Sequence, residues 1–227
     1  MSCNGTAANF RVHKNNGKKI LRPGSKLKRP FTLADLVKDY LEEVGYFGID
    51  KTLHEQHEDY LDSLTDMTDW ICGVVNDKKI PDGPPYKVDV HQRYLRVKKF
   101  QPLINLIPNK LINLKNEKFK NFEEIYEFVK KSDVKGFGAT AYYDFALRYG
   151  WHQNPKIKPD EKIYVHSKPG LAAKSLKDKG YIEVEISNPM KREDFPEEIK
   201  NSKMDAADIE HFLCIYKKLI SELPIKK

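Results

Sequence analysis

NFEEIYEFVKKSDVKGFGATAYYDFALRYGW, residues 121–151, is the most informative stretch of this 227-residue chain. It predicts a helix, a tight turn and a second helix that ends at Gly150. Asn121 is a favourable N-cap, and Glu124 three residues later completes an approximate capping box. The apolar residues of the first helix fall on one face, as expected for a helix packed against a core. They are Phe122, Ile125, Tyr126 and Val129.

The turn between the two predicted helices is Lys135-Gly136-Phe137-Gly138. Two glycines around one apolar residue allow positive φ and bring backbone N–H groups to the surface. Because free N–H groups and the helix dipole both favour negative charge, such a turn at the start of a helix predicts an anion site. Phosphate is the usual anion at such a site.

These residues resemble the helix-hairpin-helix motif of DNA-repair proteins, including the DNA glycosylase superfamily. Gly136-Phe137-Gly138 matches the glycine–apolar–glycine hairpin. Thr140-Ala141 is similar to the motif's Thr-Ala pair, one position early, and Tyr142 stands where the family usually has alanine. The resemblance implies that a DNA phosphate contacts the hairpin, with Lys135 adding charge. The implied contact residues are Lys135, Gly136, Phe137, Gly138, Ala139, Thr140 and Ala141.

The same resemblance implies where catalytic groups would stand if the chain were a DNA N-glycosylase. Bifunctional members use a lysine two residues after the second hairpin glycine, and Thr140 occupies that position here. The family's aspartate beyond the second helix has Asp160 as its candidate, but Asp160 follows a proline in a charged loop. Asp144 lies within the second predicted helix, between two aromatic residues, where a structural role is favoured. The sequence therefore favours binding over catalysis.

Length and composition limit the class of protein. No run of eighteen apolar residues occurs, and the N-terminus lacks the apolar segment of a secretory signal, so we expect no membrane partner. Three widely spaced cysteines form neither a disulfide framework nor a CxxC metal site. A cytoplasmic location and no cofactor are expected.

Positive charge is unevenly distributed along a chain of net charge +7. Residues 1–30 contain eight basic and no acidic residues, and residues 31–85 contain four basic and thirteen acidic residues. Residues 86–150, which include the hairpin, contain thirteen basic and seven acidic residues. The first and third segments are therefore candidates for contact with a polyanion, unless their lysines are simply solvated.

The positions of glycine and proline, which interrupt helices and strands, predict a mainly α fold. We expect a helical bundle that contains the helix-hairpin-helix, followed by a small α/β extension. Residues 1–30 are expected to form a flexible basic arm, 31–151 a helical domain and 152–227 the extension. Further elements are predicted from periodicity. Helices are expected from Thr32 to about Gly45, from Thr52 to Val75, two within 88–114, and at 171–179 and 208–223; strands are expected at 162–166 and 181–186.

Two further features have both a functional and a structural interpretation. His54 and His57 are spaced i, i+3 rather than the i, i+4 of a zinc-protease helix, so no metal site is predicted. Lys168 precedes a predicted helix and is a candidate phosphate contact, although a simple strand–helix turn is favoured. The predicted helix at 52–75 also has an acidic face, which we expect to be solvated or to dock a basic partner. That face consists of Glu55, Asp59, Asp62, Asp66 and Asp69.

The sequence as a whole favours a nucleic-acid-binding protein that contacts the backbone of double-stranded DNA. Two alternatives stay open. One is a monofunctional base-excision glycosylase, and the other is a protein-interaction or assembly module in which the hairpin is only a packing corner. Formation of a homo-oligomer also stays open.

Overall fold

A computed structural model describes residues 21–64, 70, 114, 117–133 and 137–226. Several predicted features lie outside these residues. They are the arm up to residue 20, the second half of the helix predicted at 52–75, the two helices within 88–114 except Leu114, and Lys135 and Gly136 of the hairpin.

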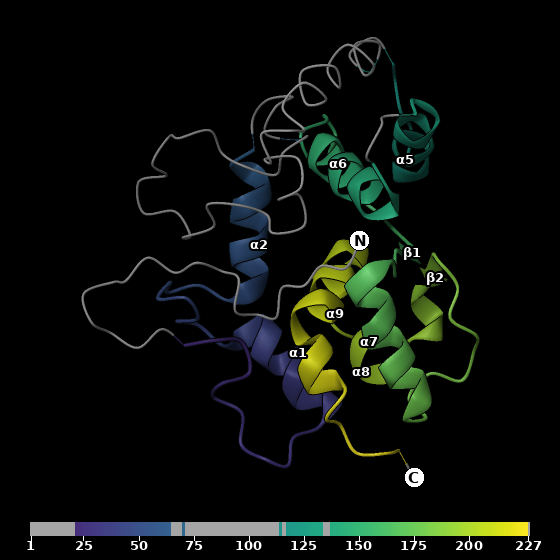
Figure 1. The fold of residues 1–227 in the computed structure, drawn as a ribbon. Helices are drawn as coiled ribbons and strands as arrows, with labels where there is room; N and C mark the ends of the chain where they lie inside the picture. Colours follow the sequence, from purple (N-terminus) through teal and green to yellow (C-terminus); the bar gives the residue numbers. More distant parts are fainter. Residues whose placement is uncertain (1–20, 65–69, 71–113, 115–116, 134–136, 227) are drawn as a thin grey trace, which may run out of the picture. The chain divides into compact units, whose positions relative to one another are not determined.

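The described residues are mainly helical, as predicted (Figure 1). A single pair of short strands is the sheet found among them, and β1 pairs antiparallel with β2. The elements are α1 (Leu33–Glu42), α2 (Leu53–Asp62), α5 (Phe122–Lys131), α6 (Ala139–Trp151), β1 (Lys162–Ile163), α7 (Ser167–Asp178), β2 (Met190–Lys191), a 3₁₀ turn (Arg192–Asp194), α8 (Glu197–Lys200) and α9 (Ala206–Ile220).

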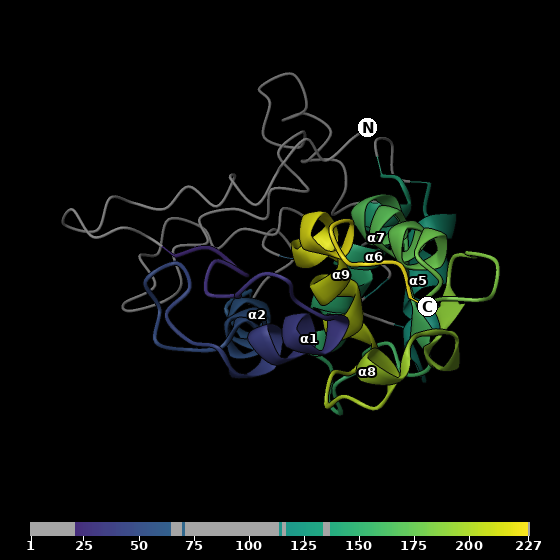
Figure 2. The ribbon, with the colours of Figure 1, turned by 90° about the horizontal axis from the view of Figure 1, so that it is seen from below.

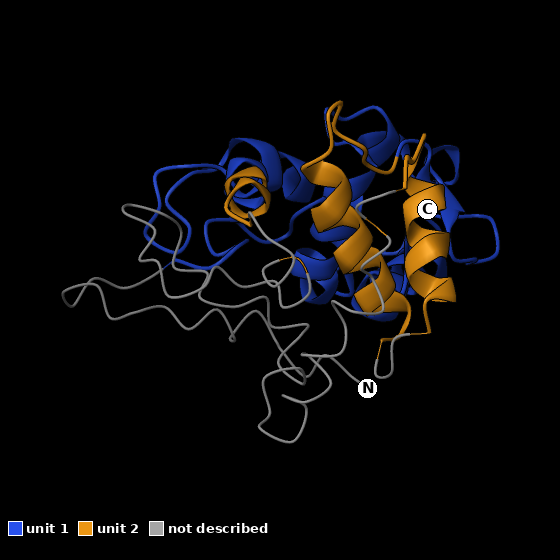
Figure 3. Ribbon diagram, turned by 90° about the horizontal axis from the view of Figure 1, so that it is seen from above, with its two compact units in different colours: residues 1–8, 12–57, 160–227 blue, residues 9–11, 58–159 orange. Residues whose placement is uncertain are grey.

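The chain forms two compact units (Figure 3). Unit 1 combines the described residues up to His57 with those from Asp160 onward, and unit 2 is formed by described residues between Glu58 and Pro159. Helix α2 crosses from the first unit into the second. The division expected from the sequence instead placed all of 31–151 in one domain.

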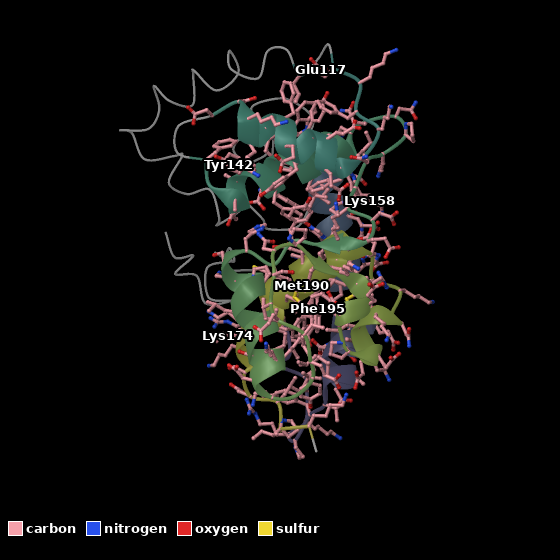
Figure 4. The ribbon with its side chains drawn as sticks, turned by 90° about the vertical axis from the view of Figure 1, so that its right-hand side faces the viewer. Glu117, Tyr142, Lys158, Lys174, Met190 and Phe195 are labelled. Carbon is pink, nitrogen blue, oxygen red and sulfur yellow. The ribbon has the colours of Figure 1, made fainter. Side chains whose placement is uncertain are left out.

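Unit 1 is built around α7 and α9, which lie side by side in both views (Figures 1 and 2). Helix α1 packs against α8 and α9, so segments from the two ends of the unit's sequence share one core. The helix predicted at 208–223 is confirmed as α9, and its apolar residues Ile209, Phe212, Leu213, Tyr216 and Ile220 are all buried. Figure 4 shows Met190 and Phe195 inside this unit and Lys174 on its surface.

The strand predicted at 181–186 is wrong. These residues alternate between apolar and polar side chains, but only Ile182 is buried, and Val184 is 41% exposed. Hydrogen-bond pairing explains the difference, because Lys162 and Ile163 pair with Lys191 and Met190 instead. An alternating pattern marks a strand only where a partner strand and a core face are available.

The arm predicted for residues 1–30 does not extend through residues 21–30, which belong to unit 1. Leu21 forms a bridge with Tyr46, and the Gly24 N–H donates to Asp39 Oδ2 at 3.0 Å. Lys26 forms an ion pair with Glu43 at 3.0 Å, and Arg29 pairs with Glu222 at 2.5 Å. Intramolecular partners therefore engage at least two of the eight basic residues assigned to the arm.

The helix predicted at 52–75 ends much earlier, at Asp62. The Ser63 hydroxyl donates to the Tyr60 carbonyl at 2.6 Å, and the Leu64 carbonyl accepts a hydrogen bond from the Trp70 indole. These bonds to backbone carbonyls compete with continuation of the helix.

Helices α5 and α6 pack against each other in unit 2, and the Asn121 cap predicted for α5 is confirmed. Aromatic pairs fill their interface. The Phe122 and Tyr143 ring centroids lie 5.6 Å apart, and those of Tyr126 and Tyr142 lie 6.3 Å apart. Tyr142, labelled in Figure 4, therefore contributes a ring contact at the position where the helix-hairpin-helix family usually has alanine.

The two glycines at the ends of α6 are expected to respond differently to alanine. A Cβ on Gly150 would lie 2.2 Å from the Ile157 carbonyl oxygen, whereas a Cβ on Gly138 would meet no atom within 4 Å. Gly150→Ala should therefore lower the free energy of unfolding by about 2 kcal/mol. Gly138→Ala should cost no more than about 1 kcal/mol. Urea denaturation of both variants measures the difference, and equal stabilities would contradict the close approach at Gly150.

Candidate functional site

The predicted anion site lies at the start of α6, formed by residues 137–141. Gly138 is the N-cap, with φ −116° and ψ −175°, and no side chain caps the helix. Gly138 is therefore extended, and it does not use the positive φ that a glycine allows. The absence of a side chain at Gly138 leaves open space next to the backbone at the start of α6. A ligand can approach the backbone closely at such a position.

The candidate contact residues of the hairpin divide into inward and outward groups. Phe137 and Ala141 are buried, and the Phe137 ring packs near those of Tyr142 and Phe145. Gly138 and Ala139 are exposed, and Thr140 is half-buried. Phe137 therefore anchors the turn, and the surface available to a ligand is the backbone of residues 138–140.

The start of α6 differs electrostatically from most other helix starts in the described residues. Four helices have a side-chain cap and an acidic residue in the first turn, which satisfies N–H groups and offsets the positive end of the helix dipole. The start of α6 has neither, and α7 shares this property. The capping residues of the four helices are Thr32 in α1, Thr52 in α2, Asn121 in α5 and Asp205 in α9.

Lys168 lies in the first turn of α7 in unit 1, where it is half-buried. The turn before it is tight, because Ser167 has φ 55° and a Cβ on Gly170 would lie 2.4 Å from the Val165 carbonyl oxygen. The helix predicted at 171–179 thus begins four residues earlier, at Ser167, after the buried N-cap His166.

The two candidate carboxylates lie in different surroundings. Asp144 Oδ2 is 3.7 Å from an Arg148 guanidinium nitrogen one turn along α6, and Arg148 is only 2% exposed. Arg148 also donates to the Trp70 carbonyl at 3.2 Å. Asp160 is exposed in the loop before β1. Asp144 thus has the structural surroundings predicted for it, and Asp160 has those of a solvated loop residue.

Asp62, from the predicted acidic face, has partners within unit 2. It accepts hydrogen bonds from the Trp151 indole at 2.6 Å and from Lys156 at 3.3 Å. Lys156 and Lys158 also lie over the Trp151 ring, 3.9 Å and 5.3 Å from its centroid. Burial raises the pKa of Asp62, but these hydrogen bonds and the Lys156 charge outweigh it and lower the pKa. Asp62 thus already has hydrogen-bond partners within unit 2. Asp66 and Asp69 lie outside the described residues.

A second polar site, which the sequence did not predict, lies in unit 1. Asp208 Oδ1 is 2.9 Å from His54 Nδ1, 3.8 Å from His57 Nδ1 and 3.4 Å from the Tyr40 hydroxyl. The Tyr40 hydroxyl is also 3.0 Å from His211 Nδ1, and the His57 and His211 rings stack with centroids 3.9 Å apart. We call these five residues the histidine cluster. Within the described part of the chain, no three His, Cys, Asp or Glu residues are arranged to hold a metal ion.

Asp208 is the only carboxylate of the histidine cluster. Its Oδ2 accepts from the Asp205 N–H at 3.1 Å, and Asp205 Oδ1 accepts from the Asp208 N–H, so the pair forms the capping box of α9. Burial raises the pKa of Asp208, but the hydrogen bonds and charges of His54 and His57 outweigh it and hold the pKa well below its usual range. The side chain therefore stays ionised inside the protein.

Asp39 forms a neighbouring network in the same core. It is 1% exposed and accepts hydrogen bonds from the Tyr46 and Tyr216 hydroxyls as well as from the Gly24 N–H. Burial and the Asp39 charge raise the pKa of both tyrosines, so both remain protonated donors. This carboxylate links residues 21–30, α1 and α9.

Comparison of the chain with family models, curated proteins and solved structures finds no significant match. Among the helices of the described residues, none combines the length and apolar character needed to cross a membrane.

The two candidate carboxylates provide a matched test of their structural roles. Asp144→Asn leaves the buried Arg148 without its carboxylate and should lower the free energy of unfolding by about 2–3 kcal/mol. Asp160→Asn changes an exposed loop residue and should stay within about 0.5 kcal/mol of the parent. Urea denaturation at neutral pH checks both. A large loss for Asp160→Asn, or none for Asp144→Asn, would contradict these assignments.

Proposed function

We propose that the protein binds nucleic acid, with phosphates of a DNA duplex contacting the start of α6. The single observation that supports this most directly is that α6 begins without a side-chain cap and without an acidic residue in its first turn. The N–H groups of a helix's first turn need partners, and the positive end of the dipole favours an anion. A phosphate oxygen satisfies both requirements.

Side-chain placement at this helix start also favours a close backbone contact. Gly138 and Ala139 are exposed and small, and a Cβ on Gly138 would project into open space. Phe137 is buried, which fixes the turn to the core beneath it. In the sequence, Lys135 comes just before this turn and adds a positive charge. It belongs to residues 86–150, which contain thirteen basic and seven acidic residues.

The N-terminal arm is expected to contribute fewer contacts to DNA than the sequence indicated. Lys26 and Arg29 pair with Glu43 and Glu222. The basic residues that precede the described part of the chain are Arg11, Lys14, Lys18 and Lys19. The hairpin is therefore the primary contact in this proposal, and these four residues would add non-specific attraction to phosphates.

No arrangement in the described residues favours the base-excision alternative. Its two candidate carboxylates are an exposed loop residue, Asp160, and a partner of buried Arg148, Asp144. Formation of abasic sites in damaged duplexes would revive that alternative. Absence of DNA binding together with a defined partner complex would favour the assembly module.

A charge placed in the first turn of α6 tests the proposal without disturbing the fold. Thr140→Glu adds a carboxylate where helices tolerate it well, because the charge opposes the dipole. The variant should fold normally but bind a short fluorescent duplex about tenfold more weakly at low salt. Val184→Glu adds the same charge at an exposed loop position of unit 1 and is the matched control.

Fluorescence anisotropy at several salt concentrations measures both affinities. For the parent, affinity should fall steeply between about 50 and 200 mM salt. Equal losses in Thr140→Glu and Val184→Glu would show a general charge effect and remove α6 as the contact. No binding by the parent at low salt would overturn the proposed function itself.

A further inference from the structure

The histidine cluster joins three helices of unit 1 through side chains that are far apart in the sequence. Tyr40 comes from α1, His54 and His57 come from α2, and Asp208 and His211 come from α9. His54 and His57 lie 2.9 and 3.8 Å from the buried Asp208 carboxylate, and His211 joins the cluster through the Tyr40 hydroxyl at 3.0 Å and through its stack on the His57 ring. The side chains of Asp208 and His57 are 5% and 10% exposed, whereas that of His54 is 30% exposed.

Proton positions in the cluster depend on one another. The Tyr40 hydroxyl has a single proton and can donate it either to Asp208 or to His211 Nδ1. If His211 Nδ1 carries a proton, it donates to Tyr40, and the Tyr40 proton must point to Asp208. Burial and the Asp208 charge raise the pKa of Tyr40 well above its usual value, so Tyr40 relays hydrogen bonds while remaining neutral.

His54 is the residue whose charge state most directly affects the strength of this junction. Its Nδ1 lies 2.9 Å from the ionised carboxylate, and a hydrogen bond from a cation to a carboxylate is stronger than one from a neutral imidazole. Protonation of His54 should therefore tighten the contact between α2 and α9. The stacked His57 and His211 rings, in contrast, would repel each other if both were charged.

The remaining charged groups around the cluster also favour a proton on His54. Asp205, the N-cap of α9, lies close enough to raise the pKa of Tyr40, and Glu55 interacts electrostatically with His54. Glu58 follows on α2. On α1, Asp39 precedes Tyr40 in the sequence, and its carboxylate accepts hydrogen bonds from Tyr46 and Tyr216. Lys51 also interacts electrostatically with Glu55, so Asp208 and Asp205 are the negative charges in direct or close contact with the cluster.

We propose that the histidine cluster is a pH-sensitive latch that fastens the first turn of α2 to α1 and α9 and is tightest when His54 is protonated. The sign follows from the contact with Asp208. A histidine that gains an anionic partner on folding binds its proton more strongly in the folded state. Its contribution to stability is complete below the ordinary histidine pKa and is lost as the pH rises through the folded value.

Titration of the imidazole of His54 in the full chain, followed by NMR, tests the latch directly. We expect His54 to titrate above the usual histidine value, because its Nδ1 lies 2.9 Å from the ionised Asp208 carboxylate. In Asp208→Asn, which keeps the side-chain size but removes the charge, this upward shift should disappear. A His54 that titrates at or below the usual value in the parent protein would overturn the proposal.

Thermal unfolding at about pH 6 and about pH 8.5 provides the stability readout. His54→Asn retains a donor near the Nδ1 position but cannot titrate, so it should lose part of the parent's gain in melting temperature at the lower pH. His152→Gln is the matched control, because His152 lies in unit 2 and its Nε2 contacts the Leu61 carbonyl at 2.9 Å. If His54→Asn keeps the parent's full pH dependence, the cluster is not a latch.

Discussion

The buried carboxylate of Asp208 connects α9 to Tyr40 of α1 and His54 of α2, which lie more than a hundred residues earlier in the sequence, and this connection constrains how the three helices meet. One oxygen closes the capping box of α9, and the other receives His54 and Tyr40 from α2 and α1. Removing one partner of a buried charge typically costs about 3–5 kcal/mol, because the remaining charge stays desolvated. The buried carboxylate of Asp39 likewise connects residues 21–30 to α1, by accepting a hydrogen bond from the Gly24 N–H.

Both carboxylates belong to a wider pattern, in which helix starts and buried donors are satisfied by side chains from this chain. Caps of this kind stabilise a helix by about 1 kcal/mol each. Helices α6 and α7 depart from the pattern, since their first turns have neither a capping side chain nor an acidic residue, and of the two it is α6 that begins at a glycine with open space around it. The proposed phosphate contact follows from this departure: the ligand would supply the negative charge that the protein supplies elsewhere.

Local signals in the sequence were sufficient to predict the elements with strong caps and helical periodicity. The helix expected from Thr32 is confirmed as α1, which Thr32 and Asp35 cap, and the Asn121 cap predicted for α5 is confirmed, because capping depends on residues within one turn. The strand predicted at 181–186 is wrong, and the helix predicted at 52–75 is confirmed from Leu53 to Asp62 but is interrupted at Ser63 and Leu64, because tertiary partners decide both segments. Periodicity does not reveal that β1 pairs with β2, or that Ser63 and Trp70 bond to carbonyls near the end of α2.

The two candidate sites also differ in whether local sequence signals could predict them. The start of α6 was visible in the sequence as a glycine turn before a helix, although the extended φ of Gly138 was not. The histidine cluster could not be predicted, because His54 and Asp208 are 154 positions apart. The i, i+3 spacing of His54 and His57 was the one local signal, and it indicated that two imidazoles share a helix face without identifying their partner.

Backbone amide NMR spectra recorded during titration with a short DNA duplex test the central claim most directly. The proposal predicts that at low salt the amide signals of Gly138, Ala139 and Thr140 shift more than those in the first turn of α5, where the Asn121 side chain already accepts from the Glu124 N–H. Duplex binding that shifts other amides while leaving the first turn of α6 unchanged would contradict the account.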